Sequence, residues 1–263
     1  MKKKIFKKFI AWFCFILLFW FFVYLESFAR TRANEIYVAV ASNFYNPLKE
    51  IAKQFEKQTR YKVQIIPGST GKLYAQIING APFELFLAGD MRRPKLLEEE
   101  GNAVPGTRFT YALGKIALWS PNSNAISKDG KLTLKQKTFT HVAIANPITA
   151  PYGQAAVQPL KKIGLWDEVQ PFVVHGENIS QTFQFISSQN AELGFVALSQ
   201  VLDPKNHKKG SWWEVPEELY DRLEQDVVLL KKGGNNPGSR KLWKFLKDDL
   251  AKQTIKRYGY GLP

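Results

Sequence analysis

The chain contains few of the residues that form covalent cross-links, metal centres or catalytic pairs. Among its 263 residues there are one Cys and three His. A single Cys excludes a disulfide scaffold and a Cys-rich zinc site. The His residues are scattered over positions 141, 175 and 207, no two of them have the spacing of metal ligands, and no nucleophile-elbow motif occurs. We therefore expect a protein that is not an enzyme, needs no cofactor and coordinates no metal ion directly through side chains.

Acidic residues are also few. The 23 Asp and Glu against 37 Lys and Arg give a net charge of +14, which by itself favours a nucleic-acid or membrane partner. The composition, 45% hydrophobic and 23% charged, excludes a disordered chain, a collagen and a coiled coil. The length predicts one large domain or two small ones.

Residues 1–33 have the layout of a secretory signal peptide. Several Lys near the start precede 17 apolar residues from Phe9 to Leu25, and small residues follow at the spacing that cleavage requires. We expect cleavage after Ala29 or Ala33. An uncleaved membrane anchor is the alternative, because such a run is at the lower limit for crossing a bilayer. Cleavage after Ala33 removes seven basic residues and one acidic residue, so the net charge falls from +14 to +8. In either case the rest of the chain is exported.

Patterns typical of strands and helices alternate along the rest of the chain. The β-branched run Ile36–Ala41 leads into residues 44–55, where apolar residues recur at helical spacing. Further strands are predicted at 63–66, 85–88, 115–119, 141–145, 171–174, 193–197 and 227–230, and further helices at 73–78, 94–100, 154–163, 181–189 and 240–256. Loops or small excursions are predicted at 121–140 and 203–220. The alternation indicates an α/β fold with mostly parallel sheets, which bind ligands at the carboxyl ends of their strands.

Small, hydroxyl and amide residues gather at four predicted junctions between a strand and a helix. These junctions are residues 42–43, 67–72, 146–153 and 176–180. The first N–H groups of a helix lack partners and carry about half a unit of positive charge, so each junction favours an anion. Ser, Thr and Asn are also the ordinary caps of helices. The pattern alone therefore does not show that the four junctions meet at one site.

A set of motifs in a fixed order supplies the missing step. The motifs are Ala41-Ser42-Asn43-Phe44, Gly68-Ser69-Thr70-Gly71-Lys72-Leu73-Tyr74-Ala75-Gln76-Ile77, Asn79-Gly80-Ala81-Pro82-Phe83-Glu84-Leu85-Phe86-Leu87, Ala103-Val104-Pro105-Gly106, Phe109-Thr110-Tyr111-Ala112, Gly114-Lys115, Leu118-Trp119-Ser120, Leu193-Gly194-Phe195-Val196-Ala197 and Lys256-Arg257-Tyr258-Gly259-Tyr260. Together they resemble the periplasmic molybdate-binding proteins of ABC importers. The resemblance covers nearly all of the chain after residue 33.

This resemblance implies the type II periplasmic binding protein fold. That fold has two α/β lobes with mostly parallel sheets and flanking helices, joined by two hinge crossings, and it holds its ligand between the lobes. Transferred to this chain, the first lobe comprises residues 34–115 and 226–263, and the second comprises residues 116–225. The resemblance also implies a periplasmic location, with delivery of the ligand to an ABC permease in the inner membrane.

The family holds its oxyanion with uncharged donors. Some members add a Tyr hydroxyl from the strand that here ends at Ala197, so this chain is expected to follow the branch that uses Asn43 instead. Side-chain donors are expected from the first lobe, and backbone N–H donors from Tyr152 and Ile179 in the second. The ligand-binding residues implied by the resemblance are Ser42, Asn43, Ser69, Thr70, Tyr152 and Ile179.

Donors alone suit a particular class of anion. Molybdate and tungstate are fully deprotonated near neutral pH, whereas phosphate keeps a proton and favours a site with a carboxylate. We therefore expect capture of molybdate, and of tungstate, by a monomer that binds no nucleic acid. Two alternatives stay open: a receptor for another oxyanion such as sulfate, and a basic exported protein that binds polyanions. Lys72 is a candidate counter-ion for the anion, although a solvated position in the first helical turn is the favoured interpretation.

Overall fold

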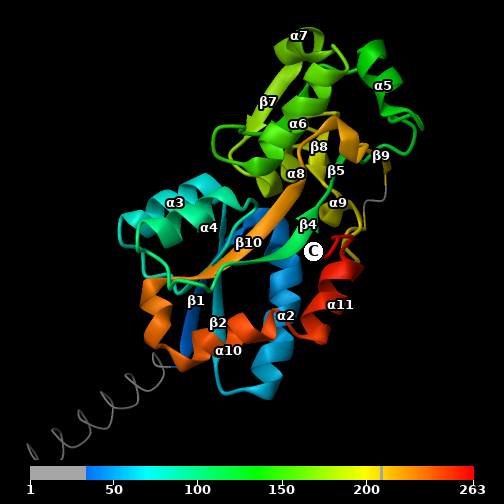
Figure 1. The fold of residues 1–263 in the computed structure, drawn as a ribbon. Coiled ribbons are helices and arrows are strands. Elements are labelled where there is room, and N and C mark those ends of the chain that lie inside the picture. Colours follow the sequence, from blue (N-terminus) through cyan, green and yellow to red (C-terminus); the bar gives the residue numbers. More distant parts are fainter. Residues whose placement is uncertain (1–33, 208–209) are drawn as a thin grey trace, which may run out of the picture.

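The computed structural model describes residues 34–207 and 210–263 and contains two five-stranded sheets, one above the other in Figure 1. The predicted signal peptide, residues 1–33, lies outside the described residues. Within the described part of the chain, no helix has both the length and the apolar character that crossing a bilayer needs. Helices flank both sheets, and the predicted two-lobe α/β fold is confirmed.

The first sheet has the strand order β2-β1-β3-β10-β4. β10 is antiparallel to both of its neighbours, and the other pairs are parallel. The strands are β1 (Glu35–Ala41), β2 (Lys62–Gly68), β3 (Leu85–Leu87), β4 (Phe109–Gly114) and β10 (Leu223–Leu229). The helices of this lobe are the 3-10 turn η1 (Ser42–Phe44), α2 (Tyr45–Gln58), α3 (Thr70–Ile78), α4 (Arg92–Glu99), the 3-10 turn η4 (Lys231–Asn235), α10 (Pro237–Phe245) and α11 (Asp249–Arg257).

The second sheet repeats this plan with the order β7-β6-β8-β5-β9. Here β5 is the strand that runs antiparallel to both neighbours. The strands are β5 (Ile116–Ser120), β6 (Val142–Ala145), β7 (Val173–Gly176), β8 (Leu193–Ala197) and β9 (Ser211–Glu214). The helices are α5 (Gly130–Gln136), α6 (Pro151–Lys162), α7 (Trp166–Val169), α8 (Ile179–Ser187) and α9 (Leu198–Val201), with 3-10 turns η2 (Gln170–Phe172) and η3 (Glu217–Leu219).

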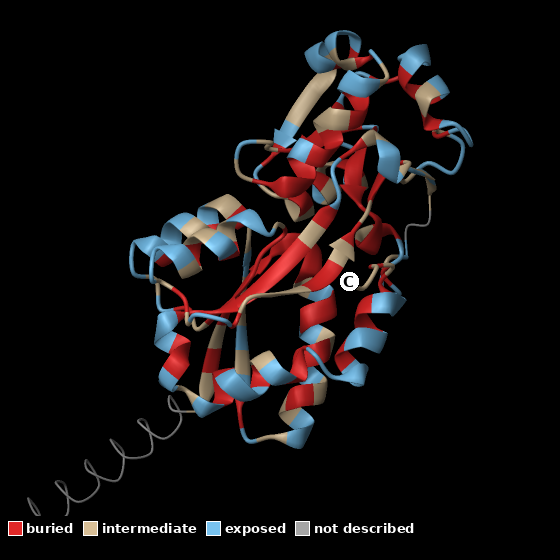
Figure 2. Cartoon of the chain, in the orientation of Figure 1, coloured by how far each residue is buried: buried red, intermediate tan, exposed pale blue. Residues whose placement is uncertain are grey.

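The central strands of each sheet are buried on both faces, as Figure 2 shows by the red strands. In the first sheet, adjacent residues of β1 point to opposite faces. Val38 packs with α2, α10 and α11, and Ala39 packs with α3 and α4. The second sheet divides in the same way, with α6 on one face and α8 on the other. This double coverage explains why the strands are short apolar runs rather than alternating ones.

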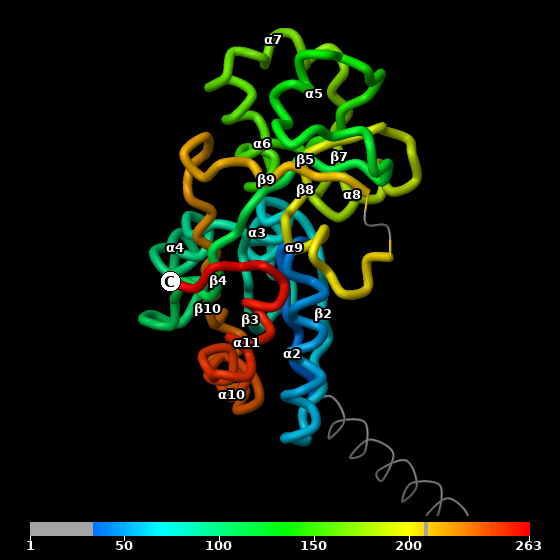
Figure 3. The backbone as a smooth tube through the Cα atoms, turned by 90° about the vertical axis from the view of Figure 1, so that its right-hand side faces the viewer, coloured from blue at the N-terminus to red at the C-terminus, as the bar shows by residue number. Residues whose placement is uncertain are grey.

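The chain crosses between the sheets at Lys115, and it returns between β9 and β10, residues 215–222. The predicted return to the first lobe at Asp226 falls inside β10. The C-terminal segment also reaches across. In Figure 3 it runs beside β4 and α9 (red), where Gly261 bridges to Leu113 and Tyr260 bonds to Ser199 of α9.

One local prediction is wrong. The expected helix over 240–256 is two helices, α10 and α11, because the backbone of Asp248 is extended and begins a new helix. The two stretches expected to be loops or small excursions, 121–140 and 203–220, contain α5 and the edge strand β9. In β9 only alternate residues are partly covered, so its hydrophobic pattern is weak. The strand β4 was not expected at all.

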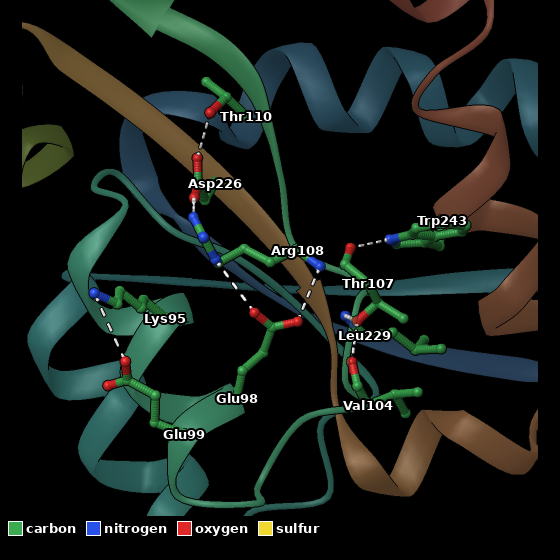
Figure 4. A network of polar contacts seen from close by, with 10 residues as sticks. All are labelled: Lys95, Glu98, Glu99, Val104, Thr107, Arg108, Thr110, Asp226, Leu229 and Trp243. Carbon is green, nitrogen blue, oxygen red and sulfur yellow. Dashed lines mark hydrogen bonds and ion pairs between the residues drawn. The ribbon is translucent and has the colours of Figure 1, made fainter.

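A buried acidic residue, Asp226, lies on β10 at the point where the pairing with β4 shifts register. The register steps from Gln225–Ala112 to Asp226–Thr110, so Tyr111 is the extra residue of a β-bulge. The Asp226 carboxylate is completely buried and accepts hydrogen bonds from Thr110 Oγ1 (2.7 Å) and an Arg108 guanidinium nitrogen (2.6 Å), as Figure 4 shows. Arg108 also pairs with Glu98 at 3.3 Å. The carboxylate is thus neutralised within the first lobe.

Replacement of Arg108 by Met should reduce the free energy of unfolding by about 3 kcal/mol, because Asp226 would be left as a buried charge without its cation. The control is Lys95→Met, which removes the exposed pair with Glu99 at 3.7 Å in the same region. That pair should contribute less than about 0.5 kcal/mol. Urea unfolding of both variants checks this expectation, and equal losses would contradict it.

Candidate ligand-binding site

Four helix N-termini meet at one small cavity between the two sheets. They belong to η1 and α3 in the first lobe, and to α6 and α8 in the second. Each follows the carboxyl end of a parallel strand, either directly or after a short loop: β1, β2, β6 or β7. The cavity has a volume of about 10 Å³, the space of about one water molecule. Its lining residues are Ala41, Ser42, Asn43, Gly68, Ser69, Thr70, Ala150, Pro151, Tyr152, Asn178 and Ile179.

All six residues expected to bind the ligand line this cavity, and all are buried: Ser42, Asn43, Ser69, Thr70, Tyr152 and Ile179. The structure therefore brings the four sequence junctions together, a step that their composition could not supply. Ala197, the position where some relatives of the resembled family carry Tyr, is buried in β8 and is absent from the lining.

Three hydroxyl groups of the first lobe have protons available for a ligand. Ser69 is 3% exposed, and its Oγ has no hydrogen-bond partner among the described residues. Thr70 Oγ1 accepts a bond from Gly89 N (3.0 Å), and Ser42 Oγ accepts a longer one from Ser180 N (3.4 Å). An accepting hydroxyl keeps its proton for donation. A buried hydroxyl without a partner is costly, so Ser69 in particular indicates a position meant for a ligand oxygen.

The second lobe offers backbone N–H groups. At the start of α8, the Asn178 side chain accepts hydrogen bonds from Ser180 N (3.0 Å) and Gln181 N (3.1 Å). It does not accept one from the N–H of Ile179, so this group is available to a ligand. At the start of α6, the bonds to Ala150 O come from residues 153 and 154, so the N–H of Tyr152 is left in the same way. Both groups lie at helix N-termini, where the helix dipole adds to the attraction for an anion.

The side chain of Asn43 binds other residues of the protein, not the ligand position that was expected. Its Nδ2 donates to Gln225 Oε1 (2.9 Å) and to Tyr260 OH (3.0 Å), which uses both of its protons. The amide donors of Asn43 are therefore committed to the protein interior. A contribution of Asn43 to the ligand has to come from its backbone.

No charged side chain is among the described residues that line the cavity. Lys72 pairs with Glu177 of the other lobe at 2.9 Å, and both side chains are about half exposed. Lys72 is thus the solvated residue that the sequence favoured, with a partner other than the anion. The described residues also contain no cluster of three or more acidic, His or Cys side chains that could hold a metal ion.

A buried layer of phenol and amide groups lies behind the cavity, and sequence reasoning missed it. Tyr111, Tyr152 and Tyr260 have their hydroxyls there, together with Gln225. Burial raises the pKa of all three phenols, that of Tyr260 to about 12. The sequence motifs contained Tyr111 and Tyr260, and Tyr152 was expected at the site through its backbone, but nothing indicated that their hydroxyls meet; nothing local marked Gln225.

Residues 36–261 match the family model described as bacterial extracellular solute-binding protein. The chain belongs to this family. Within it, the molybdate-binding protein ModA of Azotobacter vinelandii is 51% identical over 231 residues, which cover 88% of this chain and 91% of the relative. The molybdate-binding protein ModA of Rhodobacter capsulatus is 44% identical over 228 residues, 87% of this chain and 88% of the relative.

The solved structure of the periplasmic molybdate-binding protein of Azotobacter vinelandii superimposes with a TM-score of 0.83 at 38% identity, over 87% of this chain and 99% of that one. The resemblance drawn from the motifs is confirmed by these matches. They place this solute-binding protein among relatives of the same length and the same two-lobe fold.

The raised pKa of Tyr260 predicts a loss of stability at high pH. Its folded pKa of about 12 lies above the ordinary value of 10.0, so the neutral form is favoured in the folded state. The resulting stabilisation is complete below pH 10 and is lost as the pH rises toward 12. It amounts to at most about 3 kcal/mol. Urea unfolding between pH 9 and 11.5 should show a shallower decline for Tyr260→Phe than for the wild type; parallel declines would refute this.

Proposed function

We propose that this solute-binding protein captures molybdate between its lobes and delivers it to the permease of an ABC importer. One observation carries the proposal: uncharged donors from four helix N-termini surround one small cavity between the lobes, and none of the described residues that line it is charged. The identity of 51% to a molybdate-binding relative supports the same ligand. Further parts of the proposal are tungstate as a second ligand, a cleaved signal peptide at residues 1–33, a periplasmic location and a monomeric state.

The chemistry of the donors matches that of the anion. Every oxygen of a fully deprotonated tetrahedral dianion accepts hydrogen bonds, and every group we assign to the site donates them. A hydrogen bond to a charged group contributes about 1.5 to 3 kcal/mol, so several such bonds offset the loss of the hydration shell without a buried Lys or Arg. Glu177, a candidate acceptor for a protonated anion two residues before Ile179, pairs instead with Lys72 of the other lobe. The site therefore disfavours hydrogen phosphate.

The division of donors between the lobes implies that binding and closure are coupled. In the present structure the lobes touch: Gly71 N donates to Thr149 O (2.8 Å), and Ser180 Oγ donates to Ser42 O (3.2 Å). We propose an open form in which these contacts separate, and a closed form that the anion favours because only there do both sets of donors reach it. The permease then distinguishes the two forms.

The experiment that tests the function is calorimetric titration of the purified mature protein with molybdate, tungstate, sulfate and phosphate at pH 7. We expect molybdate and tungstate to bind more tightly than sulfate, and phosphate to bind most weakly. Sulfate is the instructive rival, because it too is a tetrahedral dianion and only cavity size separates it from molybdate. Tighter binding of sulfate or phosphate would remove molybdate as the ligand.

The hydroxyl of Ser69 should matter for binding and little for folding. Because Ser69 Oγ has no partner among the residues that the structure describes, Ser69→Ala removes no hydrogen bond seen there and should leave the melting temperature unchanged or raise it. The affinity for molybdate should fall by about 10- to 100-fold, the equivalent of one charge-assisted bond. The double variant Ser42→Ala/Thr70→Ala should lose more. Exposed Ser188 provides the control, and an unchanged affinity for Ser69→Ala would place its hydroxyl outside the ligand shell.

A further inference from the structure

Gln225 occupies the centre of the buried polar layer behind the cavity. It lies on β10, the strand on which the chain returns from the second lobe, and its exposure is 0%. None of the residues that line the cavity is charged, and Gln225 itself is not in the lining. Its role is therefore indirect, through the residues that it holds.

The Gln225 amide makes three hydrogen bonds, to partners from both lobes. Its Oε1 accepts from Asn43 Nδ2 (2.9 Å) and from Tyr111 OH (3.1 Å). Its Nε2 donates to Tyr152 OH (2.9 Å). Asn43 belongs to η1 of the first lobe and Tyr152 to α6 of the second. One amide thus joins the two helix ends that face each other across the ligand.

Few side chains can replace this amide. The site requires an oxygen that accepts two bonds and, on the same planar group, a nitrogen that donates one. An aliphatic residue would remove one hydrogen bond from each of Asn43, Tyr111 and Tyr152 in a buried place; Asn43 would keep its bond to Tyr260 and Tyr111 its bond to Ala88 O. A carboxylate could accept all three bonds, but it would add a negative charge behind a cavity that is built for a dianion.

The backbone around Gln225 is adapted to the same contact. Gly114 ends β4 directly before the first crossing between the lobes. A Cβ at this position would lie closer than 3.0 Å to both Gln225 Nε2 and Tyr152 OH, a separation that real Cβ atoms do not adopt. The β-bulge at Tyr111 turns that phenol toward Gln225 Oε1. A glycine and a bulge at the crossing therefore leave space for the bridge and supply its third bond.

We propose that Gln225 is a positioning residue, which fixes Asn43 and Tyr152 relative to each other and so sets the separation of the ligand donors in the two lobes. The proposal rests on the proposed function of the cavity. Without the bridge the donors sample more positions, and the anion has to order them at a cost in binding free energy. The same loss removes one interaction that holds the lobes together in the absence of ligand.

The first test is calorimetric titration of Gln225→Leu with molybdate. We expect the affinity to fall about tenfold or more, while thermal unfolding stays cooperative. Gln54→Leu is the matched control, because Gln54 bonds to Thr254 between α2 and α11, away from the cavity. Its affinity should equal that of the wild type. An affinity of Gln225→Leu equal to that of the control overturns the proposal.

A double-mutant cycle separates positioning from a merely structural role. Tyr152→Phe removes the hydroxyl that Gln225 holds and keeps the backbone N–H assigned to the ligand. If the bridge acts as a unit, the double variant Gln225→Leu/Tyr152→Phe loses no more affinity than Gln225→Leu alone. Losses that multiply would mean that the two side chains act independently, which contradicts the proposal. If Gln225→Leu does not fold, Gly114→Ala takes its place, because the added Cβ displaces the same two atoms.

The outcomes for the function and for the bridge are distinguishable. Tight binding of molybdate by the wild type and equally by Gln225→Leu leaves the function intact and removes the bridge. If the wild type binds none of the four oxyanions, the proposed function fails. Small-angle scattering of the ligand-free proteins then tests whether Gln225 holds the two lobes together. A larger radius of gyration for Gln225→Leu than for Gln54→Leu then supports the bridge, and equal radii overturn it.

Discussion

The proposed function depends on one electrostatic constraint: a doubly charged guest has to be satisfied by groups that carry no net charge. Helix N-termini meet this demand, because their first N–H groups have no partners within the helix and point along its dipole. Parallel strands deliver those termini to one edge of each sheet. The cavity lies where the two edges face each other, at the ends of β1, β2, β6 and β7. The α/β alternation of the sequence is thus a requirement of the site as much as of the core.

The remaining charges are arranged to stay out of this region. Asp226 follows Gln225 directly, yet its carboxylate is held by Arg108 and Thr110 within the first lobe. Lys72 and Glu177 neutralise each other at the rim. The phenols behind the cavity keep their protons because burial raises their pKa. A surplus of basic residues over the chain as a whole can therefore coexist with a cavity lined by neutral groups, and it acts at long range only, on the rate of encounter.

Local sequence pattern predicted much of the fold, and the resemblance drawn from the motifs predicted which residues line the cavity. The strands around Val38 and Phe195 were found because buried parallel strands are short apolar runs, and the junction loops because caps and anion sites use the same residue types. The motifs then brought the junctions together. The break at Asp248 and the edge strand β9 were missed, since both depend on tertiary contacts that override a weak local pattern. Gln225 could not be found at all: a side-chain amide that bridges residues 43, 111 and 152 leaves no periodic signal.

The two sheets share one plan, in which a single antiparallel strand lies between an outer strand and three parallel ones. Each lobe accordingly presents half of a coordination shell, and neither half encloses an anion. On the proposed function, the protein acts as a bidentate chelator: the second lobe meets a guest that the first already holds, at an effective concentration set by two short crossings. Retention and release of the anion then depend on the two crossings that connect the lobes. Binding can be tight, while release is controlled by any interaction that separates the lobes.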